Sequence, residues 1–95
     1  MKKENIKNIL LKNKEILKKY KIKRLGLFGS FLKGTNKKNS DIDLLVEFNE
    51  VIDLFEFVHI IRQLKKIFKA KVDLVTPDAL KPYIKDKILK EVNWF

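Results

Sequence analysis

The chain contains at its centre the segment Leu25-Gly-Leu-Phe-Gly-Ser-Phe-Leu-Lys-Gly-Thr35 and, five residues later, Ser40-Asp-Ile-Asp-Leu-Leu-Val46. The first segment is an apolar run that ends at a glycine turn, and the second is an apolar run that begins with two acids. Because side chains on a strand alternate between faces, Asp41 and Asp43 project to the same side. The pair of segments predicts a turn suited to phosphate beside carboxylates suited to a metal ion, which are the two halves of a metal-nucleotide site.

The Asp41 and Asp43 carboxylates repel each other unless a proton or a cation lies between them. Mg²⁺ prefers a few carboxylate oxygens, completed by water and substrate phosphates. An exposed strand end that carries two acids is the alternative interpretation of this pair. The neighbouring glycine turn favours the metal site.

The turn at Gly29-Ser30 has the features of a phosphate site. Glycine allows a positive φ and a close backbone approach, while the Ser30 hydroxyl and the following amides start a short helix where a phosphate can bind. Gly34 lets the chain double back toward the second strand. Lys33, between the glycines, either reaches a phosphate or is an exposed loop lysine. The alternative for each glycine is a turn with no ligand.

Asp73 lies in an otherwise apolar run, Val72-Asp-Leu-Val75. A charged residue in such a run needs a partner, and a cation shared with Asp41 and Asp43 would supply one. An edge-strand position that faces water is the competing explanation.

The order of predicted elements is α-β-(short α)-β-α-β-α. Asp53 and Glu56 have the spacing of a capping box at the start of the second long helix. Asp78 is placed to cap the last helix, which tolerates Pro82 only in its first turns. The alternation predicts an α/β (α+β) fold with a small mixed sheet packed against helices. The expected ranges are helix 3–20, strand 22–28, a short helix after Ser30, loop 34–39, strand 41–48, helix 53–69, strand 71–75 and a helix after Asp78.

Two of these helices carry apolar stripes that we expect to face the core. The stripe of helix 53–69 consists of Leu54, Phe57, Val58, Ile61, Leu64 and Phe68. The stripe of the last helix consists of Leu80, Ile84, Ile88 and Val92.

The length of 95 residues corresponds to a single domain, residues 1–95. Cysteine is absent and His59 is the only histidine, which excludes disulfides and thiolate metal sites and disfavours zinc. The N-terminus has the spacing of an amphipathic helix and lacks the continuous apolar run of a signal peptide or membrane span. We therefore expect a cytoplasmic protein that does not enter a membrane.

The formal net charge of +10 indicates either a polyanion partner such as nucleic acid, or a solvated, Lys-rich surface. The distribution is uneven. Residues 1–24 hold ten Lys or Arg and two acids, whereas residues 41–57 hold six acids and no Lys or Arg. A generic RNA binder has no need for such an acidic segment, but a metal-nucleotide site does.

Gly29-Ser30, Gly34 and Ser40-Asp41-x-Asp43, flanked by apolar residues, resemble the signature of the DNA polymerase beta-like nucleotidyltransferase superfamily. More narrowly, the chain resembles the minimal nucleotidyltransferases, or MNT domain proteins. The resemblance implies a nucleotidyltransferase fold with Asp41, Asp43 and Asp73 as ligands of two Mg²⁺ ions. It also implies that the triphosphate binds at Gly29 and Ser30 and that Asp73 helps to activate the attacking hydroxyl. Lys33 and Ser40 are further candidates for nucleotide binding.

The reaction implied by this resemblance is attack of an acceptor hydroxyl on the α-phosphate of ATP, with pyrophosphate leaving. Small members of the family resemble the antitoxin of HEPN/MNT toxin–antitoxin pairs, which transfers AMP to a tyrosine of a helical HEPN ribonuclease. The resemblance therefore implies a hetero-oligomer with a HEPN toxin. The chain lacks the Arg-x(4–6)-His ribonuclease motif, because His59 precedes Arg62.

Two other functions remain open from the sequence. A non-catalytic antitoxin would neutralise its toxin by binding alone, and a nucleotidyltransferase could instead act on RNA or a small molecule. The remaining distinctive residues have ordinary interpretations. We expect His59 on a helix surface, and Trp94 and Phe95 either packed on the sheet or clamping a partner.

Overall fold

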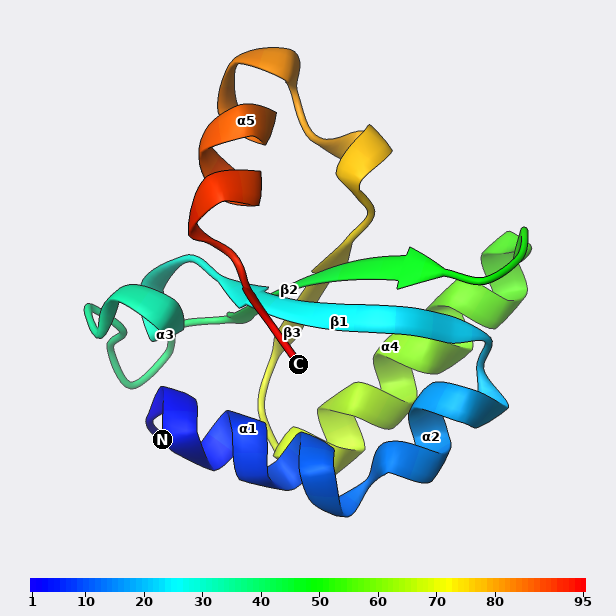
Figure 1. Ribbon diagram of the computed structural model, residues 1–95. Helices are drawn as coiled ribbons and strands as arrows, with labels where there is room; N and C mark the ends of the chain where they lie inside the picture. Colours follow the sequence, from blue (N-terminus) through cyan, green and yellow to red (C-terminus); the bar gives the residue numbers. More distant parts are fainter.

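A four-stranded mixed sheet forms the centre of the computed structural model, which describes residues 1–95 (Figure 1). The strand order is β3-β2-β1-β4, with β2 parallel to β3 and the other neighbours antiparallel. The predicted α+β fold with a small mixed sheet is confirmed. The strands are β1 (Ile22–Phe28), β2 (Ile42–Phe48), β3 (Val72–Val75) and β4 (Asn93–Trp94).

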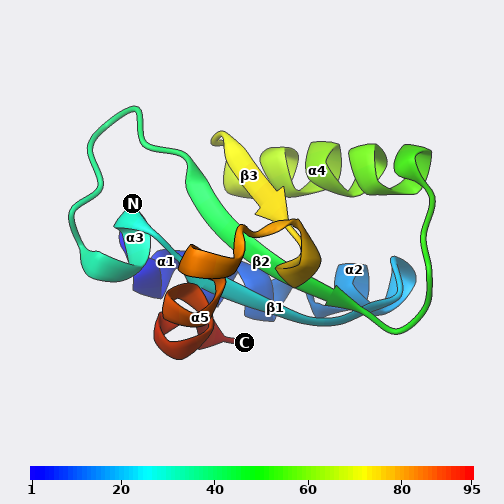
Figure 2. The same ribbon diagram turned by 90° about the horizontal axis from the view of Figure 1, so that it is seen from above.

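Helices cover both faces of the sheet, but unequally. Three helices, α1, α2 and α4, lie against one face, and α5 stands over the other (Figures 1 and 2). The short α3 connects β1 to the loop before β2. No helix is both long and apolar enough to span a bilayer. The bounds are α1 (Lys3–Lys12), α2 (Lys14–Lys19), α3 (Ser30–Lys33), α4 (Leu54–Phe68), the 3₁₀ turn η1 (Pro77–Ala79) and α5 (Pro82–Glu91).

The main core lies between the sheet and the three helices α1, α2 and α4. Alternate residues of β2 point into it, and each fully buried Leu or Ile contributes roughly 1.5–3 kcal/mol of apolar burial. The helices meet these strands with residues spaced three or four apart. The fully buried core side chains include Ile6, Leu25, Leu27, Ile42, Leu44, Val46, Ile60 and Leu64.

The predicted helix 3–20 is interrupted at Asn13, which separates α1 from α2. The Asn13 backbone leaves the helical region at φ −118° and ψ 31°. Its side-chain Nδ2 donates to the Ile9 carbonyl at 2.7 Å, and such local bonds compete with the helical ladder. The prediction of one continuous helix was therefore wrong at this residue.

The apolar stripe predicted for α4 was partly wrong. Leu64 and Phe68 are buried, as expected, but Leu54 and Val58 are exposed and Ile60 takes the central buried position. The apolar positions cover more than one face of the helix. Periodicity alone therefore does not determine which face meets the sheet, because that depends on the tertiary rotation of the helix.

The predicted start of the last helix was also wrong. Asp78 lies in η1, and α5 begins with Pro82 at its first turn after Lys81. Proline suits this position because its missing N–H has no intrahelical partner there. The inward stripe is weak as well, since α5 has no fully buried residue and Ile84 is exposed.

The strand β4 was not predicted, and it packs Trp94 on the sheet. Trp94 pairs with Gly26 of β1, and the Phe95 N–H donates to the Leu25 carbonyl at 2.9 Å. A Cβ on Gly26 would lie 2.5 Å from Val92 Cγ2 and 2.8 Å from the Trp94 ring, so only glycine fits. Of the two alternatives for Trp94 and Phe95, the structure shows packing on the sheet.

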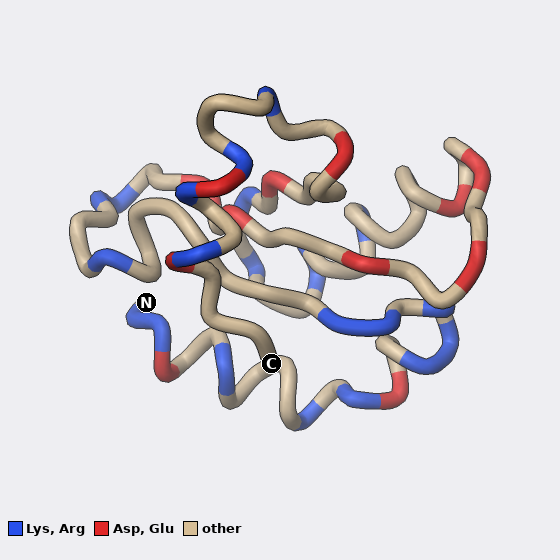
Figure 3. The backbone as a smooth tube through the Cα atoms, turned by 45° about the horizontal axis from the view of Figure 1, so that its top comes forward, with Lys and Arg blue, Asp and Glu red and all other residues tan.

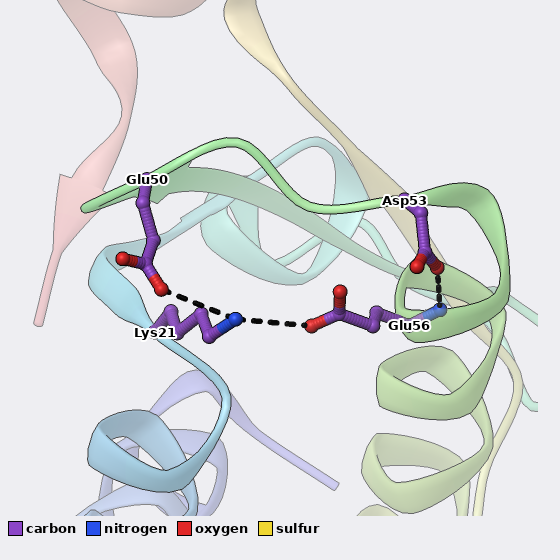
Figure 4. A network of polar contacts seen from close by, with 4 residues as sticks. All are labelled: Lys21, Glu50, Asp53 and Glu56. Atoms are coloured by element: carbon purple, nitrogen blue, oxygen red, sulfur yellow. Dashed lines mark hydrogen bonds and ion pairs between the residues drawn. The ribbon is translucent and has the colours of Figure 1, made fainter.

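A polar network fixes the connection between β2 and α4 (Figure 4). The Lys21 ammonium lies 3.1 Å from Glu50 Oε1 and 3.6 Å from Glu56 Oε2. Its hydrogen bond with Glu50 and the two negative charges raise the pKa of Lys21. Asp53 Oδ1 accepts the Glu56 N–H at 2.8 Å, so the predicted cap forms, while the Glu56 side chain turns to Lys21.

Candidate active site

Three carboxylates gather where β2 and β3 begin, at one end of the sheet. Asp43 and Asp73 are register partners on the parallel pair β2 and β3, and Asp41 directly precedes β2. Asp43 lies between the buried residues Ile42 and Leu44, so its side chain points to the face opposite the main core. The topology therefore brings together three acids that lie up to 32 positions apart in the sequence.

The electrostatics of this group favour a bound cation. Partial burial, followed by the negative charges of Asp73 and Asp41, raises the pKa of the Asp43 carboxyl to about 6. None of the three carboxylates has an ion-pair partner, although the chain carries 22 Lys and Arg. A site that repels its own charges and excludes lysine is suited to a divalent ion.

Gly29 is packed directly against the Asp43 carboxylate. Its φ of +76° is in the region that favours glycine, and a Cβ at this position would lie 2.2 Å from Asp43 Oδ2. Glycine is therefore required both by the backbone and by the space. Ser30 follows as the first residue of α3, where the N–H groups of the first turn have no intrahelical partner.

The structure places the other two candidate nucleotide-binding residues in contacts of their own. Lys33 Nζ lies 3.8 Å from Glu91 Oε2 of α5, and Ser40 Oγ accepts the Lys37 N–H at 2.8 Å. Gly34 ends α3 in the left-handed conformation, as its predicted turn requires. The roles of Lys33 and Ser40 toward a nucleotide stay predictions.

The three carboxylates fit a metal ion by their chemistry, although they do not form a closed ligand cluster. No group of three His, Asp or Glu side chains is gathered tightly enough to be a ready metal centre. Asp41 and Asp73 are exposed, so rotation about their side-chain bonds can bring their oxygens toward Asp43. The carboxylates suit a metal ion because they have no ion-pair partner and repel one another, and because Gly29 packs closely against Asp43.

Sequence reasoning missed the residues that enclose this face of the sheet. Glu91 reaches Lys33 from α5, and Arg24 stacks its guanidinium 3.7 Å from the centre of the Trp94 ring while it pairs with Glu47. Gly26 was a usable signal, because a glycine inside an apolar strand often marks a close backbone or side-chain approach.

The site and fold define the class of protein as a nucleotidyltransferase. The model of the nucleotidyltransferase domain family matches residues 6–95, and the chain belongs to this family. A provisionally named protein adenylyltransferase of Methanocaldococcus jannaschii is 44% identical over 91 residues, covering 92% of this chain and 91% of the relative. Protein adenylyltransferase MntA of Thermococcus cleftensis is 36% identical over 90 residues, covering 94% and 91%.

Solved structures show the same fold. A provisionally named minimal nucleotidyltransferase superposes with a TM-score of 0.83 at 26% identity, covering 98% of this chain and 95% of the other. A toxin-antitoxin structure with AMP-PNP gives a TM-score of 0.72 at 25% identity, covering 92% and 69%. A complex of tri-AMPylated HEPN toxin with MNT antitoxin from Shewanella oneidensis gives 0.66 at 19% identity, covering 93% and 69%, and this likeness concerns the fold alone.

Proposed function

We propose that this nucleotidyltransferase transfers AMP from ATP to a hydroxyl group of a protein partner in a Mg²⁺-dependent reaction. The observation that carries the proposal is the convergence of Asp41, Asp43 and Asp73 beside the Gly29 turn, with no lysine or arginine paired to them. The names of the relatives, which are protein adenylyltransferases, support transfer to a protein.

One group of residues would bind the metal ions and another would bind the nucleotide. Asp41, Asp43 and Asp73 would hold two Mg²⁺ ions, which supply positive charge to the phosphates and acidify the acceptor hydroxyl. Gly29 and Ser30 would hold the triphosphate through backbone N–H groups and the serine hydroxyl. Because Gly29 touches Asp43, a phosphate on this turn is brought next to the carboxylates.

The chemical step is an in-line displacement at the α-phosphorus of ATP. The acceptor oxygen forms a bond to this phosphorus while the bond to the bridging oxygen of pyrophosphate breaks. Asp73, which is exposed on the edge strand, would accept the proton of the acceptor hydroxyl.

We further propose that the acceptor is a tyrosine of a HEPN toxin and that the chain acts as its antitoxin. Support comes from the fold shared with the antitoxin of the tri-AMPylated HEPN complex and from the 25% identical toxin-antitoxin structure that binds AMP-PNP. Such a partner implies a hetero-oligomer.

The test is to incubate the chain with ATP, Mg²⁺ and the HEPN protein encoded beside its gene, and to measure the intact mass of the partner. We expect a gain of one or more AMP groups, lost with EDTA and with Asp43→Asn. Absence of any mass gain, under conditions where ATP binding is detected by calorimetry, would overturn adenylyl transfer to this partner.

A second measurement separates catalysis from simple occlusion of the toxin. The Asp41→Asn/Asp43→Asn variant should lose both the mass gain and the Mg²⁺-dependent rise in melting temperature seen with ATP. If this variant neutralises the toxin as well as the wild type does, neutralisation depends on binding alone.

A further inference from the structure

An exposed apolar surface lies at the opposite end of β2 from the three carboxylates. It consists of Val51, Leu54, Phe55 and Val58, which we call the apolar patch. Val51 is 96% exposed, Phe55 86% and Leu54 72%. These residues lie in the β2–α4 connection and the first turns of α4, where positions three and four apart share a face. Contiguous apolar exposure of this kind marks an interaction surface.

The apolar patch borders a groove that can receive side chains of a partner. The groove has a volume of about 760 Å³. It runs between the start of α4 and the segment after β3, with the last residues of β2 as its floor. Its apolar lining includes Phe48, Ile52, Leu54, Phe57, Val75 and Pro77.

Acidic side chains surround the apolar patch and the groove. Five carboxylates form this rim, and three cations pair with four of them, which leaves the rim net negative. The carboxylates are Glu47, Glu50, Asp53, Glu56 and Asp78, and the cations are Lys21, Arg24 and Lys85. In a chain of net charge +10 this is a local reversal of sign. A partner surface that complements the apolar patch and its acidic rim is apolar and flanked by Lys or Arg.

A second copy of the chain does not meet this requirement. A two-fold contact would place one acidic rim against another, and like charges at an interface are unfavourable. A contact between the apolar patch and the basic α1–α2 helices of another copy would be head-to-tail, and such contacts leave the assembly open unless the rotation closes.

From these observations we propose that the apolar patch and its groove are the docking site for an apolar segment of the partner protein that is flanked by Lys or Arg. The inference rests on the proposed function for the existence of that partner. It adds that docking is separate from chemistry, because Asp43 lies at the start of β2 and the apolar patch follows the end of β2 (Figure 1). The strand from Asp43 to Phe48 spans about 17 Å at the rise of about 3.3 Å per residue. Binding and transfer are then separable by mutation.

The experiment measures affinity for the HEPN protein encoded beside the gene, by calorimetry, for three variants. Leu54→Ser/Phe55→Ser removes the two central side chains of the apolar patch, and we expect at least a tenfold weaker affinity with unchanged ATP binding. Tyr83→Ser/Leu89→Ser is the matched control, because these exposed apolar residues lie on α5. Asp41→Asn/Asp43→Asn should bind the partner as tightly as the wild type.

The outcomes distinguish this proposal from the proposed function. Unchanged affinity of Leu54→Ser/Phe55→Ser overturns the docking site and leaves adenylyl transfer standing. Wild-type binding that is weakened by this variant, with no AMP gain on the partner, supports the docking site and overturns transfer. A wild-type dimer in sedimentation that becomes monomeric in the variant makes a second copy the occupant and overturns the proposal. No binding by the wild type overturns both the partner and its docking site.

The acidic rim is tested independently with Asp78→Lys, because the Asp78 side chain is 99% exposed and its replacement leaves the core intact. We expect several-fold weaker partner affinity and a shallower salt dependence. Glu4→Lys, on α1, is the control for a charge change elsewhere and should leave the affinity unchanged; equal affinity of both variants would contradict charge complementarity at this rim.

Discussion

The environment of Asp43 combines partial burial, two neighbouring carboxylates and close contact with the backbone at Gly29. In the absence of metal the charged form of Asp43 is disfavoured. The charged Asp43 carboxylate therefore lowers the stability of the metal-free fold, and the same carboxylate favours binding of a cation. A stability penalty that a ligand removes is typical of a functional site.

We expect Asp43→Asn to stabilise the metal-free protein at pH 7. The folded-state pKa of about 6 lies above the unfolded value of 3.8, so the Asp43 contribution is fully favourable below about pH 4 and is lost as the pH rises through 6. After discounting for partial exposure, the variant should gain about 1–2 kcal/mol at pH 7. Urea unfolding with EDTA at pH 7 and pH 4 measures this, and an equal gain at both values would contradict it.

Gly29→Ala should damage the site through a collision that Gly34→Ala does not create. Both glycines have φ near +75°, but only Gly29 has a neighbour where a Cβ would be placed. Gly34 lies in the left-handed region with ψ 16°, where alanine costs about 1–2 kcal/mol, whereas Gly29 has ψ −151° and lies in a region essentially restricted to glycine. We expect Gly29→Ala to cost more than Gly34→Ala and to lose ATP binding, as measured by urea unfolding and calorimetry. Equal effects of the two variants would mean that contact with Asp43 is unimportant.

The segment formed by α5 and β4, on the side of the sheet opposite the main core, is held by few side chains. β4 is only two residues long, and α5 contributes no fully buried residue. Trp94 covers Gly26 and carries the Arg24 guanidinium on its ring. This one side chain therefore anchors the end of the α5 segment to the sheet.

Trp94→Ala should lower the free energy of unfolding by about 2 kcal/mol, through lost apolar burial and the lost cation–π contact. Tyr83→Ala on α5 is the control, because Tyr83 is 77% exposed and its loss should change stability by less than about 0.5 kcal/mol. Chemical denaturation measures both. A Trp94→Ala effect as small as that of Tyr83→Ala would show that β4 does not anchor the segment.

Lys and Arg occur along the whole chain (Figure 3), but the excess of positive charge belongs to two segments, residues 1–20 and 57–72. Residues 1–20 carry seven Lys and two Glu, and residues 57–72 carry five Lys or Arg and no acid. These segments form α1, α2, most of α4 and the turn into β3, and the three helices lie on the face of the sheet opposite the carboxylates. The rest of the chain carries ten basic and ten acidic residues and is neutral. The four basic residues with ion pairs all lie outside these two segments.

We expect these two basic segments to bind polyanions through phosphate charge alone. Duplex RNA should bind with an affinity that falls steeply with salt, and Lys7→Glu/Lys14→Glu should weaken it several-fold. Lys87→Glu/Lys90→Glu, on α5, has the same charge change and should have little effect. Fluorescence anisotropy at several salt concentrations measures this, and salt-independent or absent binding would assign the lysines to solvation.

Much of the fold follows from local sequence patterns. The strands β1 and β2, the turn at Gly29 and the cap at Asp53 were predicted because each depends on side-chain alternation, on glycine's tolerance of positive φ or on a short-range hydrogen bond. The prediction that Asp41 and Asp43 share a face is of the same kind, since it uses only the geometry of a strand.

Other features depend on contacts between distant parts of the chain. The rotation of α4 determined that Ile60 is buried and that Leu54 is exposed. Register between strands placed Asp73 beside Asp43, and pairing with Gly26 created β4. Local periodicity specifies which residues can share a face, whereas burial and proximity are set by what packs against that face. The tertiary structure alone therefore assembled the carboxylates with the glycine turn and left the apolar patch uncovered.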